Sequence, residues 1–217
     1  MVPNCMPKQA NDNITTITLQ DVSSTVAELR EAVQQLPNLR AFKYLVIDIE
    51  DSGLSCGKVV KALEQHVSTL KTFCYYSAFF FVLEEESLSI FKDMSNLEHL
   101  FLDLSYFAAM LEEGHQDDDE VNGVTCNSLK DLEELLAVLP PSLRRLHLVG
   151  EPRRILNSMQ WLAENCKPTL LPHLREVAVE DMMLSDPSTE QSLALTCEAF
   201  AKVGVRASKE KDTMLGF

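Results

Sequence analysis

A short pattern of large apolar residues recurs along this chain of 217 residues and constrains its fold more than any other feature. The pattern is X-x-x-X-x-X, where X is a large apolar anchor and x is mostly polar. Its copies lie at 14–19, 39–44, 70–75, 97–102, 143–148, 174–179 and, most weakly, 200–205. Most copies begin about 25 to 31 residues apart, a period typical of proteins built from one repeated supersecondary unit.

One step between copies, from residue 97 to residue 143, is longer than the others and contains the acidic stretch Glu112 to Glu120. Looping out about 15 to 18 residues there restores a period of roughly 20 to 30 residues. Because this stretch has few apolar residues and its charges repel one another, we expect a disordered insertion at about 112–125. The predicted organisation is a disordered tail at 1–13, one repeat domain at 14–208 and a C-terminal tail at 209–217.

Between the copies, the spacing of hydrophobic residues changes from two to 3.6, which marks a change from strand to helix. Thr25 with Glu28, and Ser188 with Gln191, have the spacing of helix-capping boxes. Since a helix follows each strand, consecutive strands should be parallel neighbours. This predicts an α/β solenoid with a curved parallel sheet and helices on its outer face. The expected helices are 25–35, 58–67, 128–138, 155–166 and 188–202, with a short one at 88–94.

The rival fold is an open α/β sheet with helices on both faces, whose central strands would be nearly continuous apolar runs. Here polar residues separate the anchors, as in Ile14-Thr-Thr-Ile-Thr-Leu19 and Leu143-Arg-Arg-Leu-His-Leu148. We therefore expect one sheet face to be covered by helices and the other to be solvated.

Residues between the anchors should form rows across this solvated, concave face. The central strands then bring together Tyr76, Phe101, Asp103, Arg145 and His147. Aromatic side chains beside an arginine are typical of binding hot spots in protein interfaces. These residues either bind a protein partner or only decorate a solvated sheet.

The charge and the apolar runs exclude several other partners. The net charge is -14, and the dense charge runs, Glu84 to Glu86 and Asp117 to Glu120, are acidic. Nucleic-acid binding needs clustered Lys and Arg, so we expect none. We expect no membrane partner either, because no apolar run approaches the roughly 20 residues of a membrane span. The six cysteines include no C-x-x-C pair, which favours reduced thiols in a cytoplasmic or nuclear protein.

No segment fits the sequence motifs of phosphate-binding loops, zinc proteases or serine hydrolases, so we expect no cofactor, no metal and no catalysis. Cys74 has no basic residue placed to lower its pKa and should be an inert thiol. Two alternatives remain: a small open α/β enzyme with its site at the carboxyl ends of the strands, or a partnerless structural fragment of a longer protein.

Three phrases resemble the irregular leucine-rich repeats of fungal F-box proteins, and Cys197 to Arg206 is similar to their closing helix and strand. The phrases are Leu36-Pro-Asn-Leu-Arg40, Leu139-Pro-Pro-Ser-Leu-Arg-Arg-Leu-His-Leu148 and Leu171-Pro-His-Leu-Arg-Glu-Val-Ala-Val179. The resemblance covers roughly Ile14 to Ala207. It implies a leucine-rich-repeat-like solenoid that acts as the substrate-recognition part of an F-box-type ubiquitin ligase receptor.

In that family a separate helical F-box of several tens of residues holds the adaptor of a cullin-RING ligase. Residues 1–13 are too few for such a segment. We therefore expect the F-box to be absent from this chain, so that adaptor binding would need an F-box encoded upstream.

Overall fold

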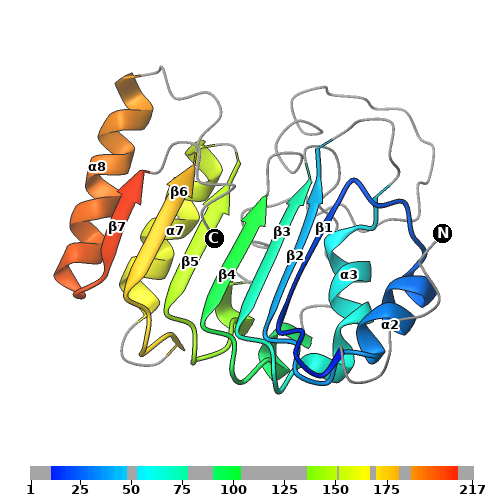
Figure 1. Ribbon diagram of the computed structural model, residues 1–217. Coiled ribbons are helices and arrows are strands. Elements are labelled where there is room, and N and C mark those ends of the chain that lie inside the picture. The colour runs from blue at the N-terminus through cyan, green and yellow to red at the C-terminus, as the bar shows by residue number, and fades with distance from the viewer. Residues whose placement is uncertain are drawn as a thin grey trace, which may run out of the picture.

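A single sheet of seven strands organises the computed structural model, which describes residues 11–47, 53–77, 90–103, 136–150, 152–166, 170–180 and 187–209. The strands follow one another across the sheet in chain order, and every neighbouring pair is parallel (Figure 1). The prediction of sequential parallel strands is confirmed. The strands are β1 (Thr16–Gln20), β2 (Ala41–Val46), β3 (Thr72–Ser77), β4 (His99–Asp103), β5 (Arg145–Val149), β6 (Glu176–Glu180) and β7 (Arg206–Lys209).

Helices connect the strands and pack against one face of the sheet. Buried helix residues such as Leu29, Val59, Met159 and Phe200 belong to the same core as the inward side chains of the strands. The described part of the chain is therefore an open α/β sheet with one buried layer between strands and helices. The helices are α2 (Val26–Gln34), α3 (Cys56–Ala62), the short 3-10 helix η1 (Glu64–His66), α7 (Pro152–Asn165) and α8 (Pro187–Lys202).

The predicted anchors of the strands form the sheet side of this core. Strand register places Phe42 beside Phe73, with ring centroids 6.5 Å apart, and Tyr44 beside Tyr75, with centroids 6.0 Å apart. The two ring planes of each pair are nearly parallel, so equivalent aromatic residues of neighbouring strands stack on each other. Leucines and valines continue the same two rows through β4, β5 and β6.

The turn before most of the strands is also repeated. The N–H of Leu97 donates to the carbonyl of Met94 at 2.9 Å, and that of Leu143 to Pro140 at 3.1 Å. Equivalent bonds precede β2 and β6. The side chain just before the anchor then ties one turn to the previous one: the Asn38 amide donates to the Asp12 carbonyl at 2.7 Å, and the Asn96 amide to the Ser68 carbonyl at 2.6 Å. The units thus share hydrogen bonds as well as apolar spacing.

Helix α2 begins as the sequence predicts. The Thr25 side chain accepts from the Glu28 N–H at 3.2 Å, and the Glu28 carboxylate accepts from the Thr25 N–H at 2.9 Å, which completes the capping box. The predicted helix 58–67 is instead divided into α3 and η1, and α7 begins earlier than predicted, at Pro152.

The seventh copy of the pattern was placed wrongly. Strand register pairs Glu176 with Arg206 and Val177 with Ala207, so β7 begins after the predicted anchors at 200, 203 and 205. Phe200 is a buried residue of α8 instead. The helix ends at Lys202, and the turn that follows contains Gly204, whose φ of +71° suits glycine; the N–H of Val205 donates to the Phe200 carbonyl at 3.0 Å.

Several predicted segments lie partly or wholly outside the described residues: the insertion at 112–125, the first two residues of the helix at 88–94, most of the helix at 128–138, the Ser188 capping box and most of both tails. Residues 90–93 and 136–138 are helical where they are described. At the N-terminal side, the carbonyl of Asn11 accepts from the N–H of Ile14 at 3.1 Å, so this turn belongs to the repeat unit. Among the described helices, none is long and apolar enough to cross a membrane.

Truncating an inward anchor should destabilise the fold strongly. Leu100 and Leu146 are fully buried between sheet and helices, so Leu100→Ala and Leu146→Ala should each lower the free energy of unfolding by roughly 2 to 5 kcal/mol. Lys58→Ala, on the exposed side of α3, should change it by less than about 0.5 kcal/mol. Urea denaturation measures all three. Similar values for the leucine variants and the lysine variant would contradict the placement of the core.

Candidate binding face of the sheet

The strand residues that alternate with the core anchors form the second face of the sheet. Its three rows run across the strands, as predicted. The first row is Thr16, Ala41, Thr72, His99, Arg145, Glu176, Arg206. The second is Thr18, Lys43, Cys74, Phe101, His147, Ala178, Ser208. The third is Gln20, Leu45, Tyr76, Asp103, Val149, Glu180.

The five predicted binding residues do meet on this face, but four of them are buried. The exposed fraction is 5% for Tyr76, 2% for Phe101 and 0% for Asp103 and His147. The Phe101 ring lies against the imidazole of His147, with centroids 4.5 Å apart. The expectation that this face is solvated is therefore wrong for the second and third rows of the central strands. Arg145, in the first row, keeps 27% of its side chain exposed.

Apolar side chains gather on the buried part of this face. Leu45, Cys74, Tyr76, Phe101 and Val149 form a second apolar cluster there. They come from four different strands, so no single copy of the pattern reveals the cluster. Strand pairing brings them side by side, and each then shields part of its neighbours' apolar surface from water.

Cys74 illustrates how this environment affects reactivity. Burial, opposed by the charge of Lys43 and reinforced by that of Asp103, raises the pKa of the Cys74 thiol to about 12. Lys43 lies directly opposite Cys74 in the register, which corrects the expectation that no basic residue is near. Because burial dominates, the thiol stays protonated at neutral pH and is a poor nucleophile.

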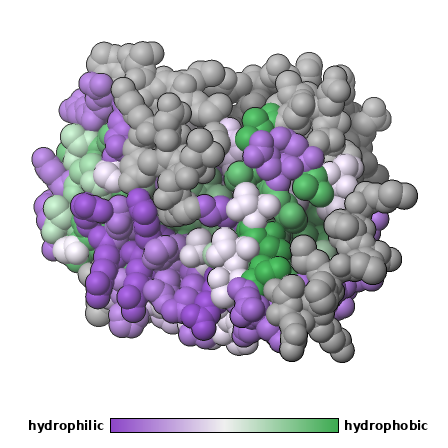
Figure 2. All heavy atoms as spheres, in the orientation of Figure 1, coloured by the Kyte–Doolittle hydropathy of each residue, from purple (hydrophilic) through white to green (hydrophobic). Residues whose placement is uncertain are grey.

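The first row is accessible and charged. The carboxylate of Glu176 forms ion pairs with two arginines on the neighbouring strands, with Arg206 Nη2 at 2.7 Å and Arg145 Nη2 at 3.3 Å. Figure 2 shows hydrophilic side chains gathered at the lower left of this face, where the amino ends of β5, β6 and β7 lie in Figure 1. Exposed ion pairs contribute only about 0 to 1 kcal/mol each to stability. Their main effect here is to orient the two guanidinium groups.

A further line of charged residues precedes the strands at the same edge of the sheet. We call it the edge row: Arg40, Lys71, Glu98, Arg144 and Arg175. Glu98 lies between two cations, with Lys71 Nζ at 2.8 Å and Arg144 Nε at 3.7 Å. The hydrogen bond from Lys71, with the charges of Lys71 and Arg144, lowers the pKa of Glu98, so it is ionised at neutral pH.

Sequence reasoning missed the edge row, although a signal for it exists. A basic residue directly follows the first anchor in four copies of the pattern, as in Leu39-Arg40, Leu70-Lys71, Leu143-Arg144 and Leu174-Arg175. These residues are far apart in the chain, but the parallel register makes them neighbours.

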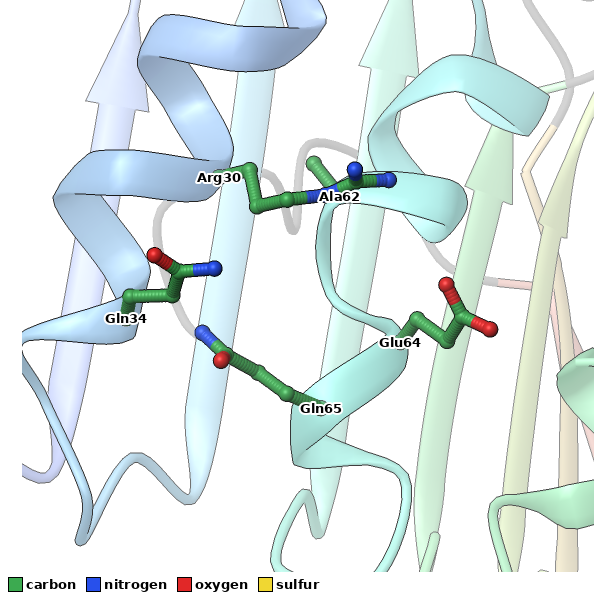
Figure 3. Close-up of a pocket in the computed structure, with 5 residues that line it drawn as sticks. All are labelled: Arg30, Gln34, Ala62, Glu64 and Gln65. Atoms are coloured by element: carbon green, nitrogen blue, oxygen red, sulfur yellow. The ribbon is translucent and has the colours of Figure 1, made fainter.

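The helix layer carries a polar groove of about 340 Å³ between α2 and the segment of α3 and η1 (Figure 3). Arg30 and Gln34 line it from α2, and Ala62, Glu64 and Gln65 from the other side. The Arg30 guanidinium donates to the Lys61 carbonyl at 3.3 Å. Within the described ranges, no group of three or more His, Cys, Asp or Glu side chains is arranged to hold a metal ion.

Comparison with known proteins adds no assignment, because no family model matches the chain and no curated protein is significantly similar to it.

The burial of Phe101 makes its truncation a test of the second face. Phe101→Ala should lower the free energy of unfolding by roughly 3 to 5 kcal/mol, because it empties a packed site. Thr72→Ala, in the more exposed first row, should cost less than about 1 kcal/mol. Thermal and urea denaturation compare the two. If Phe101→Ala unfolds like the wild type, the second cluster is not packed.

His99 gives a pH test of the first row. Burial lowers its pKa below 6.5, reinforced by Arg145 and Arg144 and opposed by Glu98 and Glu176. As the pH falls, the unfolded chain therefore binds a proton at His99 before the folded protein does. The contribution of His99 to the free energy of unfolding is fully present above about pH 6.5 and declines below it, until the pH reaches the lower pKa of the folded state. His99→Gln should reduce this decline. Urea denaturation of the wild type and of His99→Gln at pH 7.5 and pH 5.5 measures the decline. An equal decline in the two proteins would show that His99 is not the group responsible.

Proposed function

We propose that this chain is a non-catalytic protein-interaction module, and that its partner docks over the first row and the edge row of the second face. The single observation that carries the proposal is the Arg145, Glu176, Arg206 arrangement across three adjacent strands. It presents two oriented guanidinium groups on an accessible surface, and arginine is enriched in protein interfaces. Ordered side chains of this kind lose less conformational freedom when a partner binds.

The predicted binding residues keep different roles in this proposal. Arg145 contacts the partner, because its side chain reaches the surface. Tyr76, Phe101, Asp103 and His147 are buried and support the face from within. His147 lies two residues after Arg145 on β5 and packs on Phe101 of β4, so it holds neighbouring strands in a fixed relation.

The architecture we propose is a leucine-rich-repeat-like solenoid with a curved sheet and helices on its outer face. It is supported by the sequential parallel strands, the stacked anchors and the repeated turns. Following the resemblance, the module would be the substrate-recognition part of an F-box-type ubiquitin ligase receptor in the cytoplasm or nucleus. The adaptor would be held by an F-box encoded upstream.

Affinity capture from a lysate of the source organism tests the docking face. The baits are the wild type, Arg145→Glu/Arg206→Glu, and Lys58→Glu/Lys202→Glu, which makes the same charge change at exposed positions of α3 and α8. Wild type and control should recover the same proteins. The face variant should lose at least one of them by more than about tenfold, because a hot-spot residue contributes about 2 kcal/mol or more to binding.

Circular dichroism must show that all three baits are folded. Equal recovery by the face variant and the wild type would place the interaction elsewhere, with the polar groove between α2 and α3 as the next surface to examine.

A further inference from the structure

The basic residues at the amino edge of the sheet indicate what kind of partner it accepts. Together, the edge row and the first row hold six arginines and lysines but only two glutamates. The cations are Arg40, Lys71, Arg144, Arg145, Arg175 and Arg206, and the anions are Glu98 and Glu176. We propose that the partner binds through an extended acidic peptide segment that lies along this edge, across β2 to β7. The inference rests on the proposed function and names the chemistry of the partner.

Backbone hydrogen bonds set the spacing of the edge row. The Arg40 carbonyl accepts from the N–H groups of Lys71 and Thr72, at 2.7 and 3.0 Å. The carbonyls of Lys71, Glu98 and Arg144 each accept two N–H groups from the next strand in the same way. Successive edge positions are therefore about 4.8 Å apart, so the row from Arg40 to Arg175 spans about 19 Å. An extended peptide of about six residues has this length.

The cations of the edge row can be reached from solvent. Lys71 and Arg144 each keep about half of their side chains exposed, at 49% and 51%, and Arg40 and Arg175 are exposed as well. Long side chains with free rotation at their ends can turn toward carboxylates on a partner while their stems stay against the sheet.

The contrast with the rest of the chain gives the edge its selectivity. The whole chain carries a net charge of -14, so this edge is a positive area on a negative molecule. Such a surface attracts an acidic segment to one place and disfavours it elsewhere. A nucleic acid fits less well, because its uniformly negative backbone is repelled by the molecule as a whole and offers no cation to Glu98 or Glu176.

Glu98 divides the edge row into two cationic pairs. Arg40 and Lys71 lie on one side, and Arg144 and Arg175 on the other. A carboxylate placed beside Glu98 is repelled, whereas carboxylates near the two pairs are attracted. We therefore expect the preferred peptide to carry acidic residues at both ends and a neutral or basic residue in the middle.

The test uses fluorescein-labelled peptides of twelve residues and fluorescence anisotropy. The acidic probe alternates Glu or Asp with Ser, the neutral probe replaces the acids by Gln and Asn, and a single-stranded oligonucleotide of equal charge is the third ligand. The acidic peptide should bind the wild type, and its affinity should fall as salt is raised. The neutral peptide should not bind.

Three variants then locate the site. Arg144→Glu/Arg175→Glu should weaken binding of the acidic peptide by about tenfold or more, since it reverses one cationic pair. The matched control Lys58→Glu/Lys202→Glu should weaken it by less than about threefold, because the change is remote and screened by salt. Glu98→Gln should strengthen binding by about two- to fivefold, because it removes the one repulsive charge in the row. A purely structural role for Glu98 predicts no such gain.

Several results would overturn the inference. The first is failure of the acidic peptide to bind the wild type. The second is an equal loss of peptide affinity in Arg144→Glu/Arg175→Glu and in the control Lys58→Glu/Lys202→Glu, because such a loss would reflect only the total charge. Tighter binding of the oligonucleotide through the same arginines would assign a nucleic-acid site instead. If Arg144→Glu/Arg175→Glu is unfolded by circular dichroism, Arg40→Gln/Arg175→Gln takes its place. If Arg145→Glu/Arg206→Glu loses a captured protein while no acidic peptide binds, the docking face stands and only the acidic partner is wrong.

Discussion

The parallel register between neighbouring strands decides which side chains meet, and the other features of the molecule depend on it. At each step from β1 to β6, one carbonyl at the amino edge accepts two N–H groups from the next segment. A shift of one residue would exchange the two faces of a strand. It would move Leu100 out of the core between sheet and helices and move Phe101 into it. The stacked aromatic pairs, the second apolar cluster and the charged rows all require the same alignment.

The order and direction of the strands could be predicted because they follow from local information. In each of the first six copies, the apolar anchors lie on the side of the strand that faces the helices. The start of α2 was predictable for the same reason, since Thr25 and Glu28 bond each other within one turn. The last copy failed because a short apolar run fits both a strand and a helix face. Phe200 belongs to the helix, and the turn at Gly204 sets where β7 begins.

The candidate site was harder to predict because its properties arise between strands. The register of the five predicted residues was correct, but their exposure depends on neighbours that lie many residues away. Tyr76 and Phe101 lie between or beside the anchors in their own copies, where the alternation predicts exposure, yet both join one buried cluster. The basic edge was missed for a related reason. A search for runs of charge finds only the acidic stretches, whereas Arg40, Lys71 and Arg144 become adjacent through strand pairing.

Each strand of the sheet pairs with the strands that come immediately before and after it in the chain. Adding or removing one unit would therefore change two strand interfaces and leave the others as they are. The charged edge would grow or shrink by one position at the same time. If the edge binds an acidic segment as we propose, the number of units would set the length of the segment that is bound, and the residue after the first anchor of each unit would set the charge preferred at that position.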